Sequence, residues 1–166
     1  AQDLEPEYIS IDPDGSKAYV TLQENNAMMT IDLNTAQIID VVGFGFKNHN
    51  TAGNGMDASD RDPNGAPVIN ITPRKVYGMY QPDAIASYQV DGQTYLLTAN
   101  EGDARAYTAF NEEARVSTLD LDNTVFPDEA ALKNNASLGR LTVTNKLGDT
   151  GNDGDFDALY VFGARS

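Results

Sequence analysis

The chain has 166 residues, of which 40% are hydrophobic, and its formal net charge is -14 because it has 25 acidic and 11 basic residues. This composition is typical of a globular domain and argues against a disordered chain. The acidic excess argues against binding to the phosphate backbone of nucleic acids, which depends on lysine and arginine patches. No apolar run approaches the roughly 20 residues of a membrane span, and the absence of cysteine excludes disulfides, thiol catalysis and Cys-ligated zinc.

One motif occurs twice with the same internal spacing, from Pro6 to Tyr19 and from Pro82 to Tyr95. Each copy predicts a strand, an Asp-Gly turn and a second strand, followed by a polar acidic segment. A third, degenerate copy begins at Asp153 and runs through LYVFGARS. Repetition at a fixed spacing indicates stacked structural units. Since the third copy is incomplete, we expect the chain to be part of a larger protein.

The first copy predicts four consecutive antiparallel strands. The apolar, β-branched or aromatic runs lie at Tyr8–Ile11, Ala18–Leu22, Met28–Leu33 and Gln37–Val42. They are separated by DPDG, QENN and NTAQ, which are turn-forming clusters. Four such strands in about 40 residues match one blade of a β-propeller.

A long polar insertion follows, from Gly43 to Gln81, with a short strand expected at Val68–Ile71. Loops of this length are usually functional or poorly ordered. Further strands are predicted at Ala84–Val90, Thr94–Ala99, Arg115–Leu121, Arg140–Thr144 and Leu159–Gly163, with a short helix at about Asp128–Asn134.

These elements predict an all-β fold, namely a fragment of a β-propeller with about two four-stranded antiparallel blades, the start of a third and one short inserted helix. Residues 1–166 would form one partial propeller domain. Its expected parts are a first blade at about 4–43, an insertion at 44–81, a second blade at about 82–145 and the start of a third blade at about 146–166. Because an arc of blades exposes sheet edges and an uncovered face, we expect the chain to self-associate.

The acidic loop near the C-terminus is the stronger of two candidate metal sites. Its oxygen-bearing side chains are Asp149, Asn152, Asp153, Asp155 and Asp157. These groups repel one another unless a cation or solvent relieves them, and Ca²⁺ accepts six to eight oxygen ligands. The strict calcium-loop pattern fails, because Gly151 stands where an early ligand is expected. An exposed acidic turn without metal is the alternative.

The second candidate metal site lies in the insertion, where Asp60, Asp62 and Asn64 alternate ahead of a glycine. Alternation points oxygen side chains inward, and the glycine permits a sharp turn, as in the first half of a calcium loop. The bidentate acid expected at the twelfth position is missing, because Ile71 stands there, so a remote ligand such as Asp57 would be needed. The alternative is a plain turn.

The segment TANEGDAR offers weak catalytic candidates in Glu101, Asp103 and Arg105. The carboxylates could serve as metal ligands or general bases, and the guanidinium group could pair with an anion. The alternative is an ion pair between Asp103 and Arg105 that orders the loop. No convincing nucleophile accompanies these residues, because Ser59 does not lie in a strand–turn–helix elbow.

The first copy resembles the YVTN-type repeat of surface-layer β-propellers through the sequence PEYISIDPDGSKAYVTLQENNAMMTIDLNTAQIIDVV. The strings PDAIASY, TANEGDAR, LGRL and LYVFGARS resemble the choice-of-anchor I family of secreted bacterial proteins, whose members are often labelled alkaline-phosphatase-like. The resemblance covers nearly the whole chain. It implies a multi-bladed propeller, of which this chain is about a third, and an extracytoplasmic location, whether periplasmic, secreted or at the cell surface.

Two functions from different classes remain open. The first is an extracytoplasmic binding or scaffold module whose acidic loops hold structural Ca²⁺. The second is part of the active-site face of a metal-dependent phosphoesterase, alkaline-phosphatase-like or phytase-like, in which Glu101, Asp103 and the loop aspartates coordinate cations. No organic cofactor is expected. The expected partners are the remaining blades of the larger protein, another copy of the chain and a cell-surface or polymer ligand, but no nucleic acid.

Overall fold

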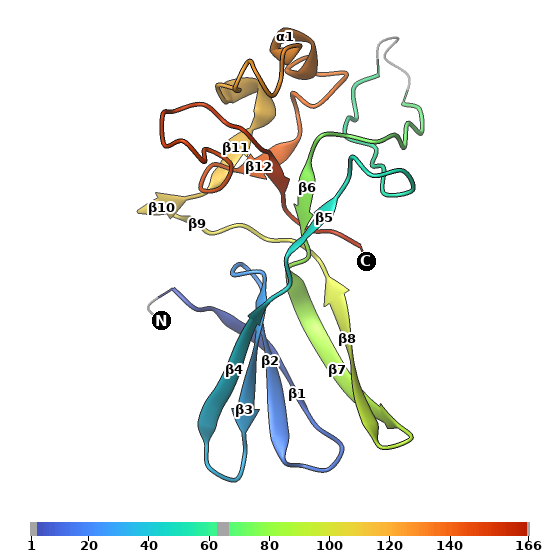
Figure 1. Ribbon diagram of the computed structural model, residues 1–166, viewed down its shortest axis with the longest axis vertical. Coiled ribbons are helices and arrows are strands. Elements are labelled where there is room, and N and C mark those ends of the chain that lie inside the picture. The colour runs from blue at the N-terminus through green and yellow to red at the C-terminus, as the bar shows by residue number, and fades with distance from the viewer. Residues whose placement is uncertain (1–2, 63–66, 166) are drawn as a thin grey trace. The chain divides into compact units, whose positions relative to one another are not determined.

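The computed structural model describes residues 3–62 and 67–165, and nearly all of their regular structure is strand (Figure 1). The strands are β1 (Pro6–Ile11), β2 (Lys17–Leu22), β3 (Ala27–Asp32), β4 (Gln37–Gly43), β5 (Phe46–Asn48), β6 (Tyr77–Met79), β7 (Pro82–Val90), β8 (Gln93–Asn100), β9 (Ala106–Tyr107), β10 (Phe110–Asn111), β11 (Glu113–Arg115), β12 (Thr142–Thr144) and β13 (Tyr160–Val161). The helices are the 3-10 turn η1 (Val116–Thr118) and the single-turn α1 (Glu129–Leu132). The predicted all-β class is confirmed. Since no sheet in the described ranges closes on itself, the propeller stays a prediction.

The chain divides into two units, each assembled from segments that are distant in the sequence. Unit 1 comprises Ala1–Phe46, Met79–Asp103 and Gly163–Ser166. Unit 2 comprises Lys47–Gly78 and Ala104–Phe162. No helix of the described residues is long and apolar enough to cross a membrane.

Unit 1 begins with an antiparallel sheet in the order β1-β2-β3-β4, so the four strands predicted from the first copy of the motif are confirmed. The Asp-Gly turn between β1 and β2 depends on Gly15, whose φ of 75° is accessible to glycine without steric cost. Val20 pairs with Ile9 of β1 and with Met29 of β3. The alternation of apolar and polar residues on these strands therefore gathers the apolar side chains on one side of the sheet.

The second copy of the motif forms the antiparallel hairpin β7–β8, which packs on the four-stranded sheet within unit 1. The hydroxyl groups of Ser10 in β1 and Ser87 in β7 lie 2.8 Å apart. Both copies show a shift in strand register directly after the leading proline, Pro6 in β1 and Pro82 in β7. The sequence repeat is therefore also a structural repeat.

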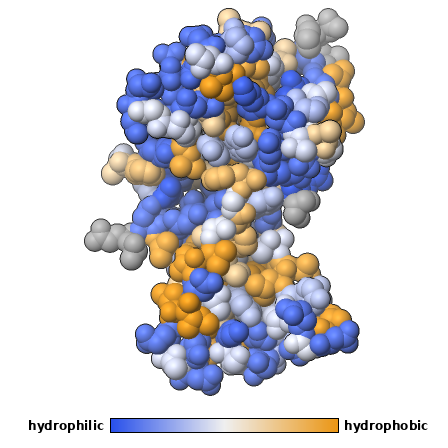
Figure 2. All heavy atoms as spheres, in the orientation of Figure 1, coloured by the Kyte–Doolittle hydropathy of each residue, from blue (hydrophilic) through white to orange (hydrophobic). Residues whose placement is uncertain are grey.

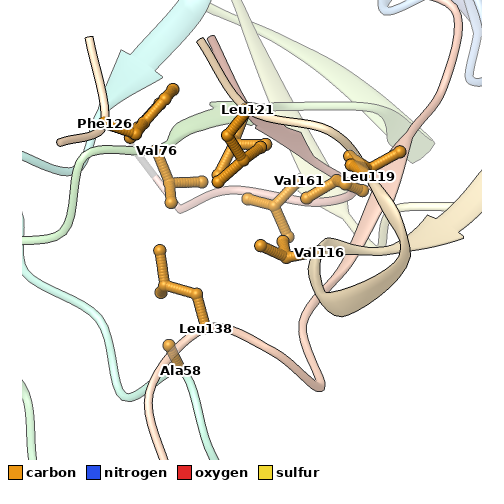
Figure 3. Close-up of a cluster of buried hydrophobic side chains, with 10 residues drawn as sticks. Ala58, Val76, Val116, Leu119, Leu121, Phe126, Leu138 and Val161 are labelled. Atoms are coloured by element: carbon orange, nitrogen blue, oxygen red, sulfur yellow. The ribbon is translucent and has the colours of Figure 1, made fainter. Parts of the chain in front are cut away.

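Unit 2 holds the larger hydrophobic core, over a mixed sheet in the order β11-β12-β13-β6-β5 (Figure 3). The strands β13 and β6 run parallel, and the rings of Tyr160 and Tyr77 stack with centroids 5.4 Å apart. The buried core residues are Ala58, Val76, Val116, Leu119, Leu121, Phe126, Leu138, Val143, Leu159 and Val161. Most of them belong to turns and loops, so this core could not be read from strand patterns.

Two predicted strands are wrong. The strand expected at Arg115–Leu121 ends at Arg115, because η1 turns the chain so that Val116, Leu119 and Leu121 all enter one core. The segment Val68–Ile71 forms no strand, and its apolar side chains are exposed.

The second blade also differs from its prediction. Within the described residues, β7 and β8 form a two-stranded sheet of their own, while β11 and β12 pair with each other. The predicted helix is confirmed in a shorter form, since α1 covers only Glu129–Leu132.

Candidate functional site

Three carboxylates from two segments of unit 2 meet at one point. One oxygen atom each of Asp122, Asp155 and Asp157 lies within 4.8 Å of the others, and all three residues are half-buried. Two of these residues were predicted as metal ligands, and the structure adds Asp122 to them. We call this group the aspartate trio.

A short backbone pairing brings the two segments together. Leu121 and Phe156 form an isolated parallel bridge, in which the Asp122 amide donates to the Phe156 carbonyl at 3.2 Å. Leu121 is fully buried, and Phe156 packs against the same core. Because neighbouring side chains of an extended segment point to opposite sides, Asp155 and Asp157 point away from the core that holds Phe156.

The loop that carries Asp155 and Asp157 is closed by Gly148. The carbonyl oxygen of Gly148 accepts hydrogen bonds from the amides of Asp157 and Ala158, at 2.8 and 3.1 Å. Gly148 has a φ of 112°, and a Cβ atom there would lie 2.1 Å from the Ala158 carbonyl oxygen. Only glycine fits this position, so the sequence LGDTG specifies the base of the loop.

The predicted ligand Asp149 organises the loop from inside. Its two carboxylate oxygens accept hydrogen bonds from the amides of Asp153 and Gly154, both at 3.1 Å. Asn152 is exposed and adopts a φ of 53°, which fits the tight turn. Asp149, Asn152 and Asp153 therefore shape the loop around the trio, and Asp149 acts as an Asx-type cap.

The members of the trio differ in their electrostatic surroundings. Hydrogen bonds from the Thr150 hydroxyl and amide, at 2.5 and 2.8 Å, hold the pKa of Asp157 below its usual value. Burial, followed by the charges of Asp153, Asp122 and Asp157, raises the pKa of Asp155. The neighbouring carboxylates thus repel the charged form of Asp155, and a bound cation would relieve this repulsion.

The predicted loop in the insertion is engaged differently. The Asp60 carboxylate accepts hydrogen bonds from Arg140 Nε at 2.7 Å and Nη2 at 3.3 Å, and this contact lowers the pKa of Asp60. Asp62 Oδ2 accepts from the Val68 amide at 2.6 Å, and Asn64 lies outside the described residues. A guanidinium group therefore already balances the first carboxylate of this loop.

The predicted catalytic candidates belong to different units. Glu101 and Asp103 are exposed residues of unit 1, whereas Arg105 belongs to unit 2. Arg105 Nε and Nη2 contact Glu112 Oε1 and Oε2 at 3.1 and 3.3 Å. Glu112 is 4% exposed and also accepts from the Thr144 hydroxyl at 3.1 Å. Arg105 thus has a structural partner, and a catalytic role for the three candidates stays a prediction.

Asp122 is the member of the trio that the sequence analysis missed. It stands in DLDNT, where Asp120 and Asp122 alternate around the buried Leu121. Asp60 and Asp62 show the same alternation of acidic residues. That pattern is the sequence signal that could have identified Asp122. The approach of this segment to the acidic loop depends on the single bridge between Leu121 and Phe156, which no local sequence pattern predicts.

The family model of the choice-of-anchor I domain matches residues 1–166. No curated protein and no solved structure matches the chain.

Proposed function

Because the chain belongs to the choice-of-anchor I family over residues 1–166, which indicates an extracellular, surface-associated domain, we propose that it is a binding or scaffold module stabilised by Ca²⁺. The ion would bind at the aspartate trio. The module would act outside the cytoplasm, in the periplasm, at the cell surface or as a secreted protein.

The observation that carries the calcium proposal is the approach of the three carboxylates to within 4.8 Å. Ca²⁺ takes six to eight oxygen ligands at about 2.3–2.6 Å, and one or more carboxylates can bind it through both oxygens. The trio provides only oxygen ligands, which suits a hard cation rather than a thiophilic one. Water and backbone carbonyls would complete the coordination sphere.

A structural role for the ion agrees with the architecture of the loop. Asp149, Gly148 and Thr150 hold the loop by hydrogen bonds to its backbone or to Asp157. The remaining strain is electrostatic, since the pKa of Asp155 is raised by burial and by neighbouring carboxylates. A cation that removes this repulsion stabilises the folded unit.

Thermal unfolding in the presence and absence of calcium tests the proposal. A ligand that binds only the native state at 100 times its Kd stabilises that state by about 2.7 kcal/mol. For a chain of this size each kcal/mol corresponds to roughly 2–4 °C in Tm. We therefore expect millimolar CaCl₂ to raise Tm by roughly 5–10 °C and EGTA to reverse the shift.

Two substitutions sharpen this measurement. Asp155→Asn removes a charge from the trio and should abolish the calcium-dependent rise in Tm. Asp40→Asn makes the same change at an exposed position in β4 and should leave the rise intact. An unchanged Tm of the natural chain in millimolar calcium would contradict the proposal.

The phosphoesterase alternative needs its own assay. A scaffold module should show no turnover of phosphomonoesters with or without divalent cations. If turnover is found, the scaffold proposal fails, and the double substitution Glu101→Ala and Asp103→Ala then tests whether these residues take part.

A further inference from the structure

Equivalent residues in the two copies of the motif differ sharply in exposure. Ile9 follows Pro6 by three residues, and Ile85 follows Pro82 by three residues. Ile85 is 4% exposed, whereas Ile9 is 56% exposed. The same structural position is therefore covered in one copy and open in the other.

The packing inside unit 1 explains this difference. The Ser10 and Ser87 hydroxyl groups lie 2.8 Å apart, so the side of β1 that carries Ser10 faces the side of β7 that carries Ser87. Side chains alternate along a strand, so Ile85 shares the covered side with Ser87. Ile9 lies on the opposite side from Ser10.

We define the isoleucine face as the side of the four-stranded sheet that carries Ile9. Strand register places Ile9, Val20, Met29 and Val41 in one row across all four strands. Ile9 and Val41 are 56% and 49% exposed, and the face contains a hollow of about 380 Å³ lined in part by Val20 and Met29. Ile11 and Ile38 extend the same apolar surface.

We define the tyrosine face as the side of the hairpin β7–β8 that points away from the sheet. Tyr88 and Tyr95 stack on it with ring centroids 5.4 Å apart, and both are exposed. Val90 and Leu97 lie on the same side, and Leu97 is 60% exposed. Figure 2 shows hydrophobic surface on unit 1, to which this hairpin belongs.

The tyrosine face is also an open version of a covered surface. Leu97 pairs with Ala86 in the second copy, in the place where Tyr19 pairs with Ser10 in the first. Tyr19 is only 8% exposed, because its side of the sheet receives the hairpin. Unit 1 thus contains one contact between the two copies of the motif. The isoleucine face of the first copy and the tyrosine face of the second copy, which correspond to the two sides of that contact, are exposed.

We propose that the isoleucine face of one molecule packs on the tyrosine face of a second copy of this chain, head to tail. A second molecule is the expected partner because the chain already makes this kind of contact within itself. The side of β7 that carries Ile85 packs on the side of β1 that carries Ser10. Both open faces continue that interface through the same strands. Two different surfaces meet in such an arrangement, so it is a heterologous interface.

The size of the faces sets the expected strength of association. The smaller of the two faces limits the contact, and its two strands, about 4.8 Å apart and about eight residues long, cover roughly 10 Å by 26 Å. This footprint is about a third of the roughly 800 Å² per partner that a standard interface buries, so the association should be weak and dependent on concentration. The net charge of -14 opposes it, and salt should therefore strengthen it by screening.

Sedimentation of the full chain over a range from about 10 to 500 μM, at physiological and at higher salt, tests the proposal with two variants. Ile9→Lys places a charge on the isoleucine face, and Leu97→Lys places one on the tyrosine face. Both residues are more than half exposed, at 56% and 60%, so the fold should survive. Leu147→Lys, at a residue of unit 2 that is 43% exposed, is the matched control.

The natural chain and the Leu147→Lys control should form dimers and larger species as concentration rises. Each face variant alone should remain monomeric. An equal mixture of the two face variants should form dimers only, because each supplies the face that the other lacks. A natural chain that is monomeric throughout, a face variant that associates by itself, or a mixture that stays monomeric would each overturn the head-to-tail contact.

Discussion

The hydroxyl group of Tyr19 donates a 2.7 Å hydrogen bond to the Oδ2 atom of Asp12, and both residues are buried. Thr94 of the hairpin β7–β8 donates to the same carboxylate at 3.2 Å. Burial, followed by the contact with Asp12, raises the pKa of Tyr19 to about 12. The phenol therefore remains a donor over the whole physiological range, and one carboxylate ties both copies of the motif together.

Tyr19→Phe should destabilise the folded chain by about 1.5–3 kcal/mol, because a hydrogen bond to a charged group is lost and Asp12 remains buried. Tyr95→Phe, at the equivalent sequence position of the second copy, is the control. Tyr95 is 46% exposed, so this substitution should change stability by no more than about 0.5 kcal/mol. Urea denaturation of both variants provides the comparison, and equal effects would show that the Asp12 contact contributes nothing.

The free energy of unfolding of unit 1 should fall with rising pH because of Glu24. Burial, followed by the proximity of Glu5 and Glu7, raises the pKa of Glu24 from 4.5 to about 7. A carboxyl group whose pKa is higher in the folded state favours folding while it is protonated. This contribution is complete below pH 4.5 and is lost as the pH rises through about 7.

The substitution Glu24→Gln removes this titration. Glu24 is partly exposed, so solvent screening reduces the effect to the order of 1 kcal/mol. Denaturation curves between about pH 5 and 8 should show the decline for the natural chain and a flatter profile for the variant. Parallel profiles for the two proteins would assign the pH dependence to other groups.

Glu112→Ala should destabilise unit 2 by about 3–5 kcal/mol, because it leaves the charge of Arg105 without this buried partner. The Glu112 carboxylate also accepts hydrogen bonds from the Arg105 amide at 2.9 Å and from the Thr144 hydroxyl at 3.1 Å. Glu113→Ala changes the neighbouring exposed residue and should cost no more than about 0.5 kcal/mol. Similar losses of stability in the two variants would mean that the ion pair contributes little.

The parts of the fold that the sequence predicted are those governed by local patterns. Alternating apolar residues and the Asp-Gly turn at Gly15 define the four strands of the first sheet. Pro82, Asp91 and Gly92 define the hairpin in the same way. Short-range backbone preferences and side-chain alternation are sufficient for these elements, and the structure follows them closely.

The parts that could not be predicted depend on contacts between distant segments. The core of unit 2 draws Val116 and Leu121 from turns, where no period of two or of 3.6 residues operates. The aspartate trio needs the single bridge between Leu121 and Phe156. The sequence therefore located the acidic loop and the two carboxylates that it contributes to the trio, but it did not show that Asp122, from a distant segment, would join them.

Gly148→Ala tests whether the base of the acidic loop positions the trio. A Cβ atom at Gly148 would lie 2.1 Å from the Ala158 carbonyl oxygen, while at Gly154 it would meet nothing within 4 Å. Both glycines have positive φ, at 112° and 102°, so both alanine variants bear a backbone cost of about 1–2 kcal/mol. Gly148→Ala should lose at least about 1 kcal/mol more, because the backbone must move.

Since that movement displaces Asp157, whose amide donates to Gly148, the Gly148→Ala variant should also lose the calcium-dependent rise in Tm, and Gly154→Ala should keep it. Equal stability and equal calcium response in the two variants would show that Gly148 does not set the geometry of the trio.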